Sequence, residues 1–359
     1  MKICIILGTR PEIIKMAPII RECEKKHADY FVLHTGQHYS INMDKIFFDE
    51  LKLPQPGYNL DVGSGTHAKQ TADMLVGIEN VLLKEKPDIV LVEGDTNTVL
   101  AGSLAASKLH ILVGHVEAGL RSYDRNMPEE INRILSDHVS DYLFAPTEKA
   151  KSNLLSEGIP ANKIFVTGNT IVDSVLQHIK LVKEKSDVLK NMNLKKDGYI
   201  LMTAHRQENV DVKNRLKGIF DGLKIICKEY RLPVIFPIHP RTRKRMEAFG
   251  LKETEGIVFT EPVGFLDFLE LESNARLVLT DSGGVQEETC ILNVPCVTLR
   301  DNTERPETID VGSNMLAGTT PEKIRDSVRH MISKKTNWKN PFGDGKAALR
   351  ILSILDKMS

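Results

Sequence analysis

The sequence contains no long apolar run and no excess of charge of either sign. No stretch approaches the roughly 20 consecutive apolar residues that a membrane-spanning helix needs, so we expect the protein to act from the aqueous side. Lysine and arginine together number 48, and aspartate and glutamate together also number 48. This balance argues against nucleic acid or an anionic membrane surface as the main partner.

Cysteine is scarce, and the motifs of several enzyme classes are missing. The five cysteines show no Cys-x-x-Cys spacing, and an odd number scattered through the chain predicts reduced thiols rather than disulfides. The apolar start, residues 1–7, is followed at once by Gly8 and is too short for a signal peptide, so we expect a cytoplasmic protein. The absence of metal-ligand spacing and of Gly-x-Ser-x-Gly disfavours zinc chemistry and a nucleophilic hydrolase, and we predict no metal site.

Short aliphatic runs alternate with helical stretches along the whole chain, which is typical of a parallel, doubly wound α/β sheet. The runs of the first half are residues 2–7, 30–34, 88–92, 111–117, 142–145 and 164–167. After a Lys-rich stretch at residues 180–197, the same rhythm restarts with residues 199–203, 234–238, 257–260, 277–280 and 297–299. Two such series predict two Rossmann-like domains that face a central cleft, with ligands at the carboxyl ends of the strands.

The length of the chain fits this division. A chain of 359 residues is comfortable for two domains of about 150 to 200 residues each. We predict an N-terminal domain at residues 1–175 and a C-terminal domain at residues 176–345. Apolar residues at helical spacing in the tail predict a last helix at residues 346–359, which we expect to pack back on the N-terminal domain.

Two turns between a strand and a helix predict phosphate contacts. The first strand runs into Gly8-Thr9-Arg10-Pro11-Glu12, where glycine permits a tight turn and proline suits a helix start. Arg10, with Lys15 just over one turn further, suits a phosphate bound by the helix N–H groups, and a solvated basic helix start fits equally well. The motif is not Gly-x-Gly-x-x-Gly and no acidic residue ends the second strand, so dinucleotide binding is disfavoured.

The second turn is Asp281-Ser282-Gly283-Gly284, directly after the apolar run 277–280. A strand, a small turn and a helix start together form a diphosphate cradle, in which the serine donates its hydroxyl and both glycines let the backbone approach the phosphates. Glu288, one helical turn further, is placed to hold ribose hydroxyls. Arg305, in Thr303-Glu304-Arg305-Pro306-Glu307, adds a cation for the diphosphate. A capped strand-to-helix turn and a salt-bridged loop are the purely structural alternatives.

Acidic residues gather at the predicted strand ends of the first half. They are Glu93, Asp95 and Glu117, with Glu129 and Glu130 in the helix that Pro128 begins. Carboxylates in a closed, partly desolvated site have raised pKa values and act as general bases or acids, whereas an isolated carboxylate is more often a helix cap or half of an ion pair. In the second half His205, beside Arg206, follows a strand and suits an acid or a phosphate donor.

Taken together, the motifs closely resemble those of the non-hydrolysing UDP-N-acetylglucosamine 2-epimerases. In chain order they are Gly8-Thr9-Arg10-Pro11-Glu12, Glu93-Gly94-Asp95, Glu117-Ala118-Gly119-Leu120-Arg121, Pro128-Glu129-Glu130-x-Asn132-Arg133, His205-Arg206, Asp281-Ser282-Gly283-Gly284-x-Gln286-Glu287-Glu288 and Thr303-Glu304-Arg305-Pro306-Glu307. The resemblance covers nearly the whole chain. It implies the two-domain glycosyltransferase-B architecture, an active site between the domains and a homodimer.

The resemblance also implies a reaction, the reversible interconversion of UDP-N-acetylglucosamine and UDP-N-acetylmannosamine without a cofactor. No carbonyl group lies on a ring carbon beside carbon 2, so direct removal of its proton faces a high barrier. If the bond from carbon 1 to UDP breaks first, the ring gains oxocarbenium character and a carboxylate can take the adjacent proton. The intermediate is 2-acetamidoglucal with bound UDP, and re-addition of UDP with protonation from the opposite face inverts carbon 2.

The functional residues of the family carry over to positions of this chain. The catalytic groups fall on Asp95, Glu117, Glu130 and His205. The carboxylates act at carbon 2, and the histidine lies near the departing diphosphate. The nucleotide contacts fall on Arg10, Lys15, Arg206, Ser282, Gly283, Gly284, Glu288 and Arg305.

Bacterial members of the family bind a second UDP-N-acetylglucosamine as an activator. The matching contacts in this chain are Gln37, Glu208 and His239. The surrounding sequence departs from the bacterial motifs Gln-His-Arg-Gln and His-Arg-Arg-Glu, because it reads Gln37-His38-Tyr39-Ser40 and His205-Arg206-Gln207-Glu208.

Three other functions share much of this sequence pattern. A hydrolysing relative uses the same elimination but lets water capture the intermediate, which releases free N-acetylmannosamine and UDP. A glycosyltransferase on the same scaffold would use a carboxylate to activate an acceptor hydroxyl, which the clustered carboxylates make less attractive. A non-catalytic UDP-sugar sensor would bind without turnover, and the intact Asp95, Glu117 and Glu130 argue against it.

Overall fold

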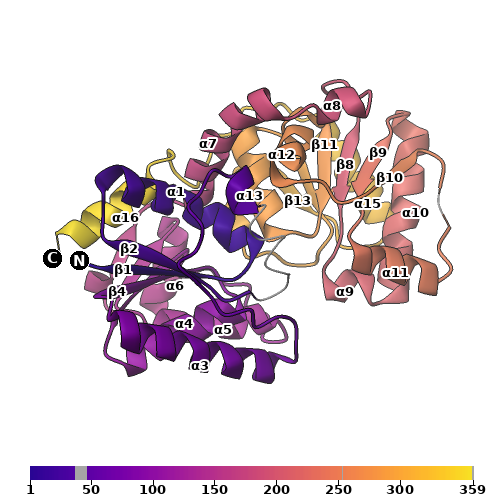
Figure 1. Ribbon diagram of the computed structural model, residues 1–359. Helices are drawn as coiled ribbons and strands as arrows, with labels where there is room; N and C mark the ends of the chain where they lie inside the picture. The colour runs from indigo at the N-terminus through magenta and orange to yellow at the C-terminus, as the bar shows by residue number, and fades with distance from the viewer. Residues whose placement is uncertain (37–46, 253, 358–359) are drawn as a thin grey trace. The chain divides into compact units, whose positions relative to one another are not determined.

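The computed structural model describes residues 1–36, 47–252 and 254–357. The chain forms two compact units, which are Met1–Leu176 together with Phe342–Ser359, and Gln177–Pro341 (Figure 1). Each unit is built on one parallel β-sheet with helices, which confirms the predicted α/β class. Within the described ranges, no helix is both long and apolar enough to cross a membrane.

The first unit contains a seven-stranded sheet in the order β3-β2-β1-β4-β5-β6-β7, in which neighbouring strands are parallel. Its strands are β1 (Ile3–Leu7), β2 (Tyr30–His34), β3 (Tyr58–Asn59), β4 (Ile89–Glu93), β5 (Leu112–Val116), β6 (Tyr142–Ala145) and β7 (Ile164–Val166). Its helices are α1 (Arg10–Lys26), α3 (His67–Glu85), α4 (Asn97–Lys108), α5 (Pro128–Val139), α6 (Glu148–Ser156), the short 3-10 helix η1 (Ala161–Lys163), the first part of α7 (Thr170–Lys185), and α16 (Ala347–Asp356). The strand β1 is buried along its whole length, as expected for a central strand covered on both faces.

The second unit contains a six-stranded parallel sheet in the order β10-β9-β8-β11-β12-β13. Its strands are β8 (Ile200–Thr203), β9 (Val234–Pro237), β10 (Ile257–Thr260), β11 (Leu277–Thr280), β12 (Cys296–Thr298) and β13 (Asn314–Leu316). Its helices are α8 (Val188–Asn191), α9 (Gln207–Val210), α10 (Lys213–Tyr230), α11 (Pro240–Ala248), α12 (Phe265–Asn274), α13 (Gly283–Leu292), α14 (Pro306–Asp310) and α15 (Pro321–Ile332).

The strand order reverses once in each sheet. In the first unit the chain runs outward through β2 and β3 on one side of β1, and through β4 to β7 on the other. In the second unit it runs outward through β9 and β10 on one side of β8, and through β11 to β13 on the other. Ligands of open parallel sheets bind at the carboxyl ends of the strands at such a switch point. The topology therefore indicates the ends of β1 and β4, and the ends of β8 and β11, as candidate sites.

The predicted strands all occur, each within one residue of its predicted ends. The sequence did not predict the short edge strands β3 and β13, which have two and three residues. In β13 the buried residue Asn314 is polar, and its side chain accepts a hydrogen bond from Thr298 at 2.8 Å, so no apolar run marks this strand. The Lys-rich stretch predicted to separate the two domains folds as the end of α7 and the short helix α8.

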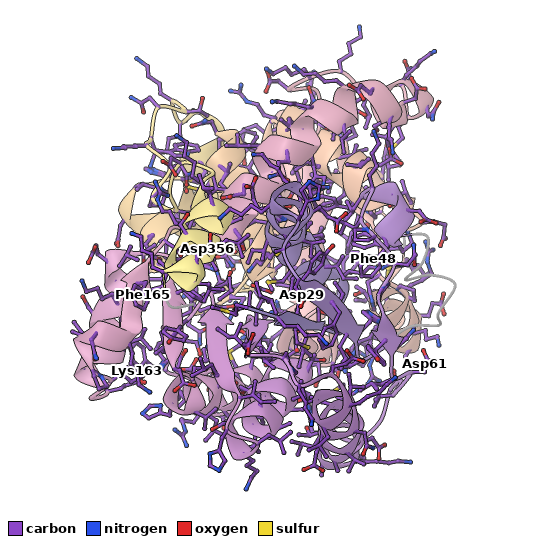
Figure 2. The ribbon with its side chains drawn as sticks, turned by 60° about the vertical axis from the view of Figure 1, so that its left-hand side comes forward. Asp29, Phe48, Asp61, Lys163, Phe165 and Asp356 are labelled. Carbon is purple, nitrogen blue, oxygen red and sulfur yellow. The ribbon has the colours of Figure 1, made fainter. Side chains whose placement is uncertain are left out.

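The last helix, α16, belongs to the first unit and occupies the tail in which the sequence predicted a helix. It packs against α1, and Ile351 on its inner face is fully buried. Asp173 of α7 accepts hydrogen bonds from the N–H groups of Ala347 and the next residue, both at 3.1 Å, which satisfies free donors at the helix start. At the other end Asp356, labelled in Figure 2, pairs with Lys26 of α1 at 2.6 Å.

We expect Ile351→Ala to destabilise the protein by about 2 to 5 kcal/mol, because it leaves a cavity in a packed interface. The matched control is Leu349→Ala on the same helix, where the residue is 43% exposed. For the control we expect a change of no more than about 0.5 kcal/mol. Urea unfolding followed by far-ultraviolet circular dichroism measures both variants. Equal midpoints would show that α16 does not stabilise the first unit.

Candidate active site

The turn after β1 is held in one conformation by close packing. A Cβ atom at Gly8 would lie 2.0 Å from Oγ1 of Thr35 and 2.3 Å from Oγ1 of Thr98, so only glycine fits there. Arg10 opens α1 directly after this turn, and its guanidinium group lies 5.5 Å from the centre of the Phe47 ring. The start of α1 therefore lies at the switch point of the first sheet.

A buried carboxylate ties this turn to the end of β4. Glu12, in the first turn of α1, accepts the N–H groups of Gly8 and Thr9, the second at 2.9 Å. It also accepts the hydroxyl of Thr96, which follows β4. Burial raises the pKa of Glu12 to about 7, although the hydrogen bonds that it accepts act in the opposite direction. Glu12 therefore exchanges a proton near neutral pH beside the end of β4.

Lys15 of α1 lies between two carboxylates at the ends of β4 and β5. Its ammonium group forms an ion pair with Glu117 and lies 3.4 Å from Oε1 of Glu93. The three side chains are at most 9% exposed. Burial raises the pKa of Glu93 well above its usual range, even though the charge of Lys15 lowers it. One ammonium group serves two buried carboxylates, so it does not offset the charge of both.

Glu117 combines an unusual backbone with a buried carboxylate. Its φ angle is 69°, a left-handed conformation that residues other than glycine rarely adopt. Its carboxylate also accepts a hydrogen bond from the side-chain amide of Asn169 at 3.1 Å. Because β1, β4 and β5 are neighbours in the sheet, the ends of these strands meet at one edge. Strain of this kind is typical of functional sites.

Asp95 follows β4, and its side chain is 27% exposed. Its carboxylate pairs with the buried guanidinium group of Arg133, which also bonds to Glu130 at 2.7 Å. Glu130 accepts three further hydrogen bonds, each at 2.9 Å, from the N–H and hydroxyl groups of Ser122 and the N–H group of Tyr123. The structure thus joins Asp95 and Glu130 through Arg133. The catalytic role of Glu130 stays a prediction.

In the second unit a buried aspartate organises the ends of β8 and β11. Asp281 is fully buried and accepts the backbone N–H groups of His205 and Arg206 at 3.1 and 3.0 Å. It also accepts the side-chain amide of Asn209 at 3.1 Å. The ring Nδ1 of His205 lies 3.2 Å from the same carboxylate, and 46% of the His205 side chain is exposed. Burial alone would raise the pKa of Asp281, but its interactions with His205 and the N–H donors bring it below the usual range.

The turn after β11 forms the start of α13. Ser282 is the residue before the helix, and the helix begins at Gly283. A Cβ atom at Gly283 would lie 3.0 Å from Oε1 of Glu304, which favours glycine. The first turn of α13 carries no acidic side chain, so its N–H groups and the positive end of the helix dipole suit an anion. Glu288, further along the same helix, is 7% exposed.

Arginine–glutamate pairs surround this helix start. Arg206 lies 3.3 Å from Glu304, and Arg305 lies 2.7 Å from Glu287. Arg300, which is fully buried, pairs with Glu304 at 2.8 Å. Arg300 was not among the residues predicted from the sequence. Its position just after β12 could have indicated Arg300, because the carboxyl end of β12 lies beside that of β11.

The residues predicted to bind an activator are only partly described. Gln37 lies outside the described residues. Glu208 on α9 lies 3.3 Å from the buried Arg300. His239 precedes α11 and accepts the N–H group two residues further on at 3.2 Å, and the centre of its ring lies 6.3 Å from that of His205. The activator site stays a prediction.

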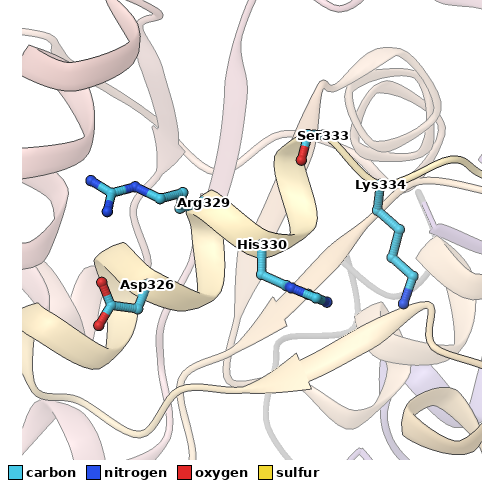
Figure 3. Close-up of a pocket in the computed structure, with 5 residues that line it drawn as sticks. All are labelled: Asp326, Arg329, His330, Ser333 and Lys334. Carbon is cyan, nitrogen blue, oxygen red and sulfur yellow. The ribbon is translucent and has the colours of Figure 1, made fainter.

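A surface hollow of about 740 Å³ lies elsewhere in the second unit, beside α15 (Figure 3). Its lining residues are Asp326, Arg329, His330, Ser333 and Lys334. None of the predicted site residues lines it, and Arg329 is already paired with Glu229 at 3.0 Å. Across the part of the chain that the structure describes, no group of three or more His, Cys, Asp or Glu side chains is placed to hold a metal ion.

Comparisons with known proteins agree on one family. Residues 21–356 match the family profile described as UDP-N-acetylglucosamine 2-epimerase. The chain is 62% identical to the UDP-N-acetylglucosamine 2-epimerase of Methanocaldococcus jannaschii, with 99% of each chain covered. It is 44% identical to the UDP-2,3-diacetamido-2,3-dideoxy-D-glucuronate 2-epimerase of Pseudomonas aeruginosa, with 100% of each covered. It is also similar to the crystal structure of the M. jannaschii enzyme in complex with UDP-GlcNAc and UDP, with a TM-score of 0.94 at 62% identity over 99% of this chain and 100% of that one.

We expect Asp281→Asn to destabilise the second unit by about 1 to 3 kcal/mol, because buried N–H donors lose a charged acceptor. Trp338 is the sole tryptophan and its indole N–H donates to the Cys290 carbonyl oxygen at 2.9 Å, so its fluorescence during urea unfolding reports on this unit. The control is Asp301→Asn, whose side chain is 66% exposed and pairs with Arg215. For the control we expect a loss of about 1 kcal/mol or less. A wild-type midpoint for Asp281→Asn would show that this carboxylate does not hold the turn.

Proposed function

The chain belongs to the UDP-N-acetylglucosamine 2-epimerase family, and we propose that it interconverts UDP-N-acetylglucosamine and UDP-N-acetylmannosamine. The observation that carries this proposal is the cluster of Glu93, Asp95 and Glu117 at the ends of β4 and β5, with Lys15 and Arg133 as its cations. Inversion of carbon 2 removes a proton from one face of the sugar and returns a proton to the other. Such a reaction needs at least two acid–base groups, and this cluster offers them.

The proposed reaction runs through elimination. The bond between carbon 1 and the UDP oxygen breaks, a carboxylate takes the proton from carbon 2, and a double bond forms between the two carbons. The products of this half-reaction are 2-acetamidoglucal and bound UDP. In the return step the UDP oxygen re-forms its bond to carbon 1, and a second acid protonates carbon 2 from the opposite face. We assign the two proton transfers to Asp95 and Glu117, with Glu93 and Lys15 setting the charge around Glu117.

We assign the nucleotide to the start of α13. The N–H groups of Gly283 and Gly284 and the hydroxyl of Ser282 bind the diphosphate, and Arg206 and Arg305 supply positive charge. Glu288 accepts the ribose hydroxyls. His205, which Asp281 holds in place, donates to the departing diphosphate, and this lowers the charge that develops as the bond to carbon 1 breaks.

We further propose a cytoplasmic homodimer that supplies a nucleotide sugar to polysaccharide synthesis. All five cysteines are free thiols, which suits a reducing compartment. The apolar residues Val76 and Leu83 of α3 are 60% and 55% exposed, and they offer a surface that a second copy would cover.

The same inversion on UDP-2,3-diacetamido-2,3-dideoxy-D-glucuronate is a second candidate, because a relative of that name is 44% identical along its whole length. The two sugars differ at carbons 3 and 6, whereas the proposed chemistry takes place at carbons 1 and 2. The 62% identity to a UDP-N-acetylglucosamine 2-epimerase favours the first candidate.

The first test is incubation of the purified protein with UDP-N-acetylglucosamine in deuterated water, followed by proton NMR. We expect UDP-N-acetylmannosamine with deuterium at carbon 2, because the second acid, which protonates carbon 2 from the opposite face, carries a deuteron taken from the solvent. Free N-acetylmannosamine and UDP would identify the hydrolysing reaction instead. Turnover of only the diacetamido-glucuronate sugar would select the second candidate, and no turnover of either would contradict the proposal.

We expect Asp95→Asn and Glu117→Gln each to lower turnover by about 100-fold or more, since positioned acid–base groups contribute at least that much. Affinity for UDP, measured by isothermal titration calorimetry, should stay within a few-fold of the wild type, because neither residue is assigned to the nucleotide. The matched control is Asp73→Asn on an exposed position of α3, which should turn over like the wild type. Full activity in either variant would remove that residue from the mechanism.

A further inference from the structure

His115 in β5 is a buried histidine to which the proposed reaction assigns no role. It is 0% exposed. Its Nδ1 atom lies 2.7 Å from Oδ1 of Asp137 in α5, and its Nε2 atom lies 2.8 Å from the carbonyl oxygen of Gly94. Gly94 directly follows β4, which is the neighbour of β5 in the sheet. The ring therefore connects the end of one strand to a helix that packs against the next.

The partners of the His115 ring determine where its protons lie. A carbonyl oxygen only accepts hydrogen bonds, so Nε2 carries a proton that it donates to Gly94. Asp137 also accepts the N–H group of Gly119 at 3.2 Å and pairs with the guanidinium group of Arg121 at 2.7 Å. Asp137 is therefore the ionised acceptor, and Nδ1 donates to it. A histidine that donates from both ring nitrogens is an imidazolium cation.

The charges around the ring agree with this assignment. Burial alone would lower the pKa of His115, but Asp137 and the carbonyl group of Gly94 bring it above the usual range. Burial alone would raise the pKa of Asp137, but His115 and Arg121 bring it below the usual range. Arg121 also pairs with Glu157 at 2.6 Å. Two cations thus meet two carboxylates, so this network buries no uncompensated charge.

The peptide group that His115 holds is the one that joins Gly94 to Asp95. The φ angle of Gly94 is 86°, a left-handed conformation that glycine adopts readily. On the other side, the carbonyl oxygen of Asp95 accepts the side-chain amide of Asn132 at 3.0 Å. The backbone is therefore fixed by a side-chain hydrogen bond both before and after Asp95. This backbone sets the direction of the Asp95 carboxylate, whose side chain is 27% exposed.

Asp137 extends the same network to the loop after β5. Gly119, whose N–H group it accepts, lies two residues after Glu117. The φ angle of Gly119 is 86°, and a Cβ atom there would lie 2.4 Å from the carbonyl oxygen of Ala150, so only glycine fits. The ion pair between His115 and Asp137 thus joins the two loops that carry the proposed proton-transfer groups.

We propose that His115 is a positioning residue for proton transfer: as a buried cation it holds the peptide group between Gly94 and Asp95, and it thereby places the Asp95 carboxylate at carbon 2 of the sugar. This inference rests on the proposed assignment of a proton transfer to Asp95. A general base acts only within hydrogen-bond reach of the proton that it removes. A displacement of about 1 Å can therefore lower turnover by about 100-fold.

Two substitutions separate the two hydrogen bonds of the ring. The amide nitrogen of asparagine takes the place of Nδ1, so His115→Asn keeps the donor for Asp137 and removes the donor for Gly94. The amide nitrogen of glutamine takes the place of Nε2, so His115→Gln keeps the donor for Gly94 and removes the donor for Asp137. The matched control is His138→Asn, on an exposed position of α5.

We expect His115→Asn to lower kcat by about tenfold or more, because the peptide before Asp95 is released. His115→Gln should stay within about threefold of the wild type, since a neutral donor replaces a charged one. The affinity for UDP, measured by isothermal titration calorimetry, should not change in either variant. The urea midpoint should fall at least as far in His115→Gln as in His115→Asn, because the glutamine leaves Asp137 without a partner. Activity and stability should therefore fall in opposite order.

A double variant tests whether His115 acts through Asp95. In the Asp95→Asn protein, the further change His115→Asn should lower kcat by less than about twofold, because the carboxylate that His115 positions is already absent. A purely structural role predicts the same loss in both backgrounds.

Three kinetic outcomes would overturn the inference and leave the proposed epimerase function standing. His115→Asn could keep the kcat of the wild type, or His115→Gln could lose as much activity as His115→Asn. The losses of Asp95→Asn and His115→Asn could also multiply in the double variant. A wild type without turnover would overturn the proposed function and this inference together.

A second measurement needs no variant to fold. Neutron diffraction from crystals of the wild type at pD 8 locates deuterons directly. We expect a deuteron on both Nδ1 and Nε2 of His115. A ring nitrogen of His115 without a deuteron would show that the residue is not a cation that donates to both partners, and this would overturn the inference.

Discussion

One arrangement recurs at the switch points of both sheets: a buried carboxylate accepts the backbone N–H groups of the turn after the central strand. In the first unit Glu12 holds the turn after β1 and also bonds Thr96 after β4. In the second unit Asp281, after β11, holds the turn after β8. The strand order reverses at these two points, and the carboxylate joins the loops that diverge there. The helices α1, α4, α9 and α13 begin at these turns, and the proposed site residues take their positions from them.

The same arrangement shifts the pKa values of the two carboxylates in opposite directions, because their surroundings differ. Asp281 receives N–H donors and faces His205, so its pKa falls below the usual range despite burial. At Glu12 burial prevails, and the pKa rises to about 7. Glu93, which shares the Lys15 ammonium group with Glu117, also has a raised pKa. Glu12 and Glu93, two carboxyl groups with raised pKa values, thus lie beside the end of β4. A reaction that takes a proton from one face of a carbon and returns one to the other face needs acid–base groups of this kind.

The sequence predicted the strands and the turns at their ends because both signals are local. Apolar runs mark the strands, and small residues such as those of Asp281-Ser282-Gly283-Gly284 mark the turn after β11. The partners of the site residues were not predictable, because they depend on burial and on distant segments. Lys15 was assigned to phosphate from its spacing to Arg10, yet its ammonium group meets Glu117, which is 102 positions away. Glu272 lies among alternating apolar and acidic residues that are typical of a half-exposed helix, yet it is fully buried, because α8 and α13 both pack against α12.

In the proposed site, binding of the diphosphate depends more on the backbone N–H groups at the start of α13 than on Arg206 and Arg305. Arg206 and Arg305 are already paired with carboxylates, so a diphosphate must compete with those partners, and the net gain is smaller than two unpaired cations would give. The first turn of α13 contains no acidic side chain of its own, so its N–H groups do not have to give up an ion pair within that turn. The two glycines there serve different purposes. At Gly283 a side chain would collide with Glu304, which explains the need for glycine there. At Gly284 there is room for a side chain, because a Cβ atom would lie 3.9 Å from its nearest described neighbour, Oγ of Ser282. Protein packing therefore does not require glycine at position 284. The open space beside Gly284 is what a phosphate needs to reach the N–H groups at the start of α13 while UDP is detached from the sugar.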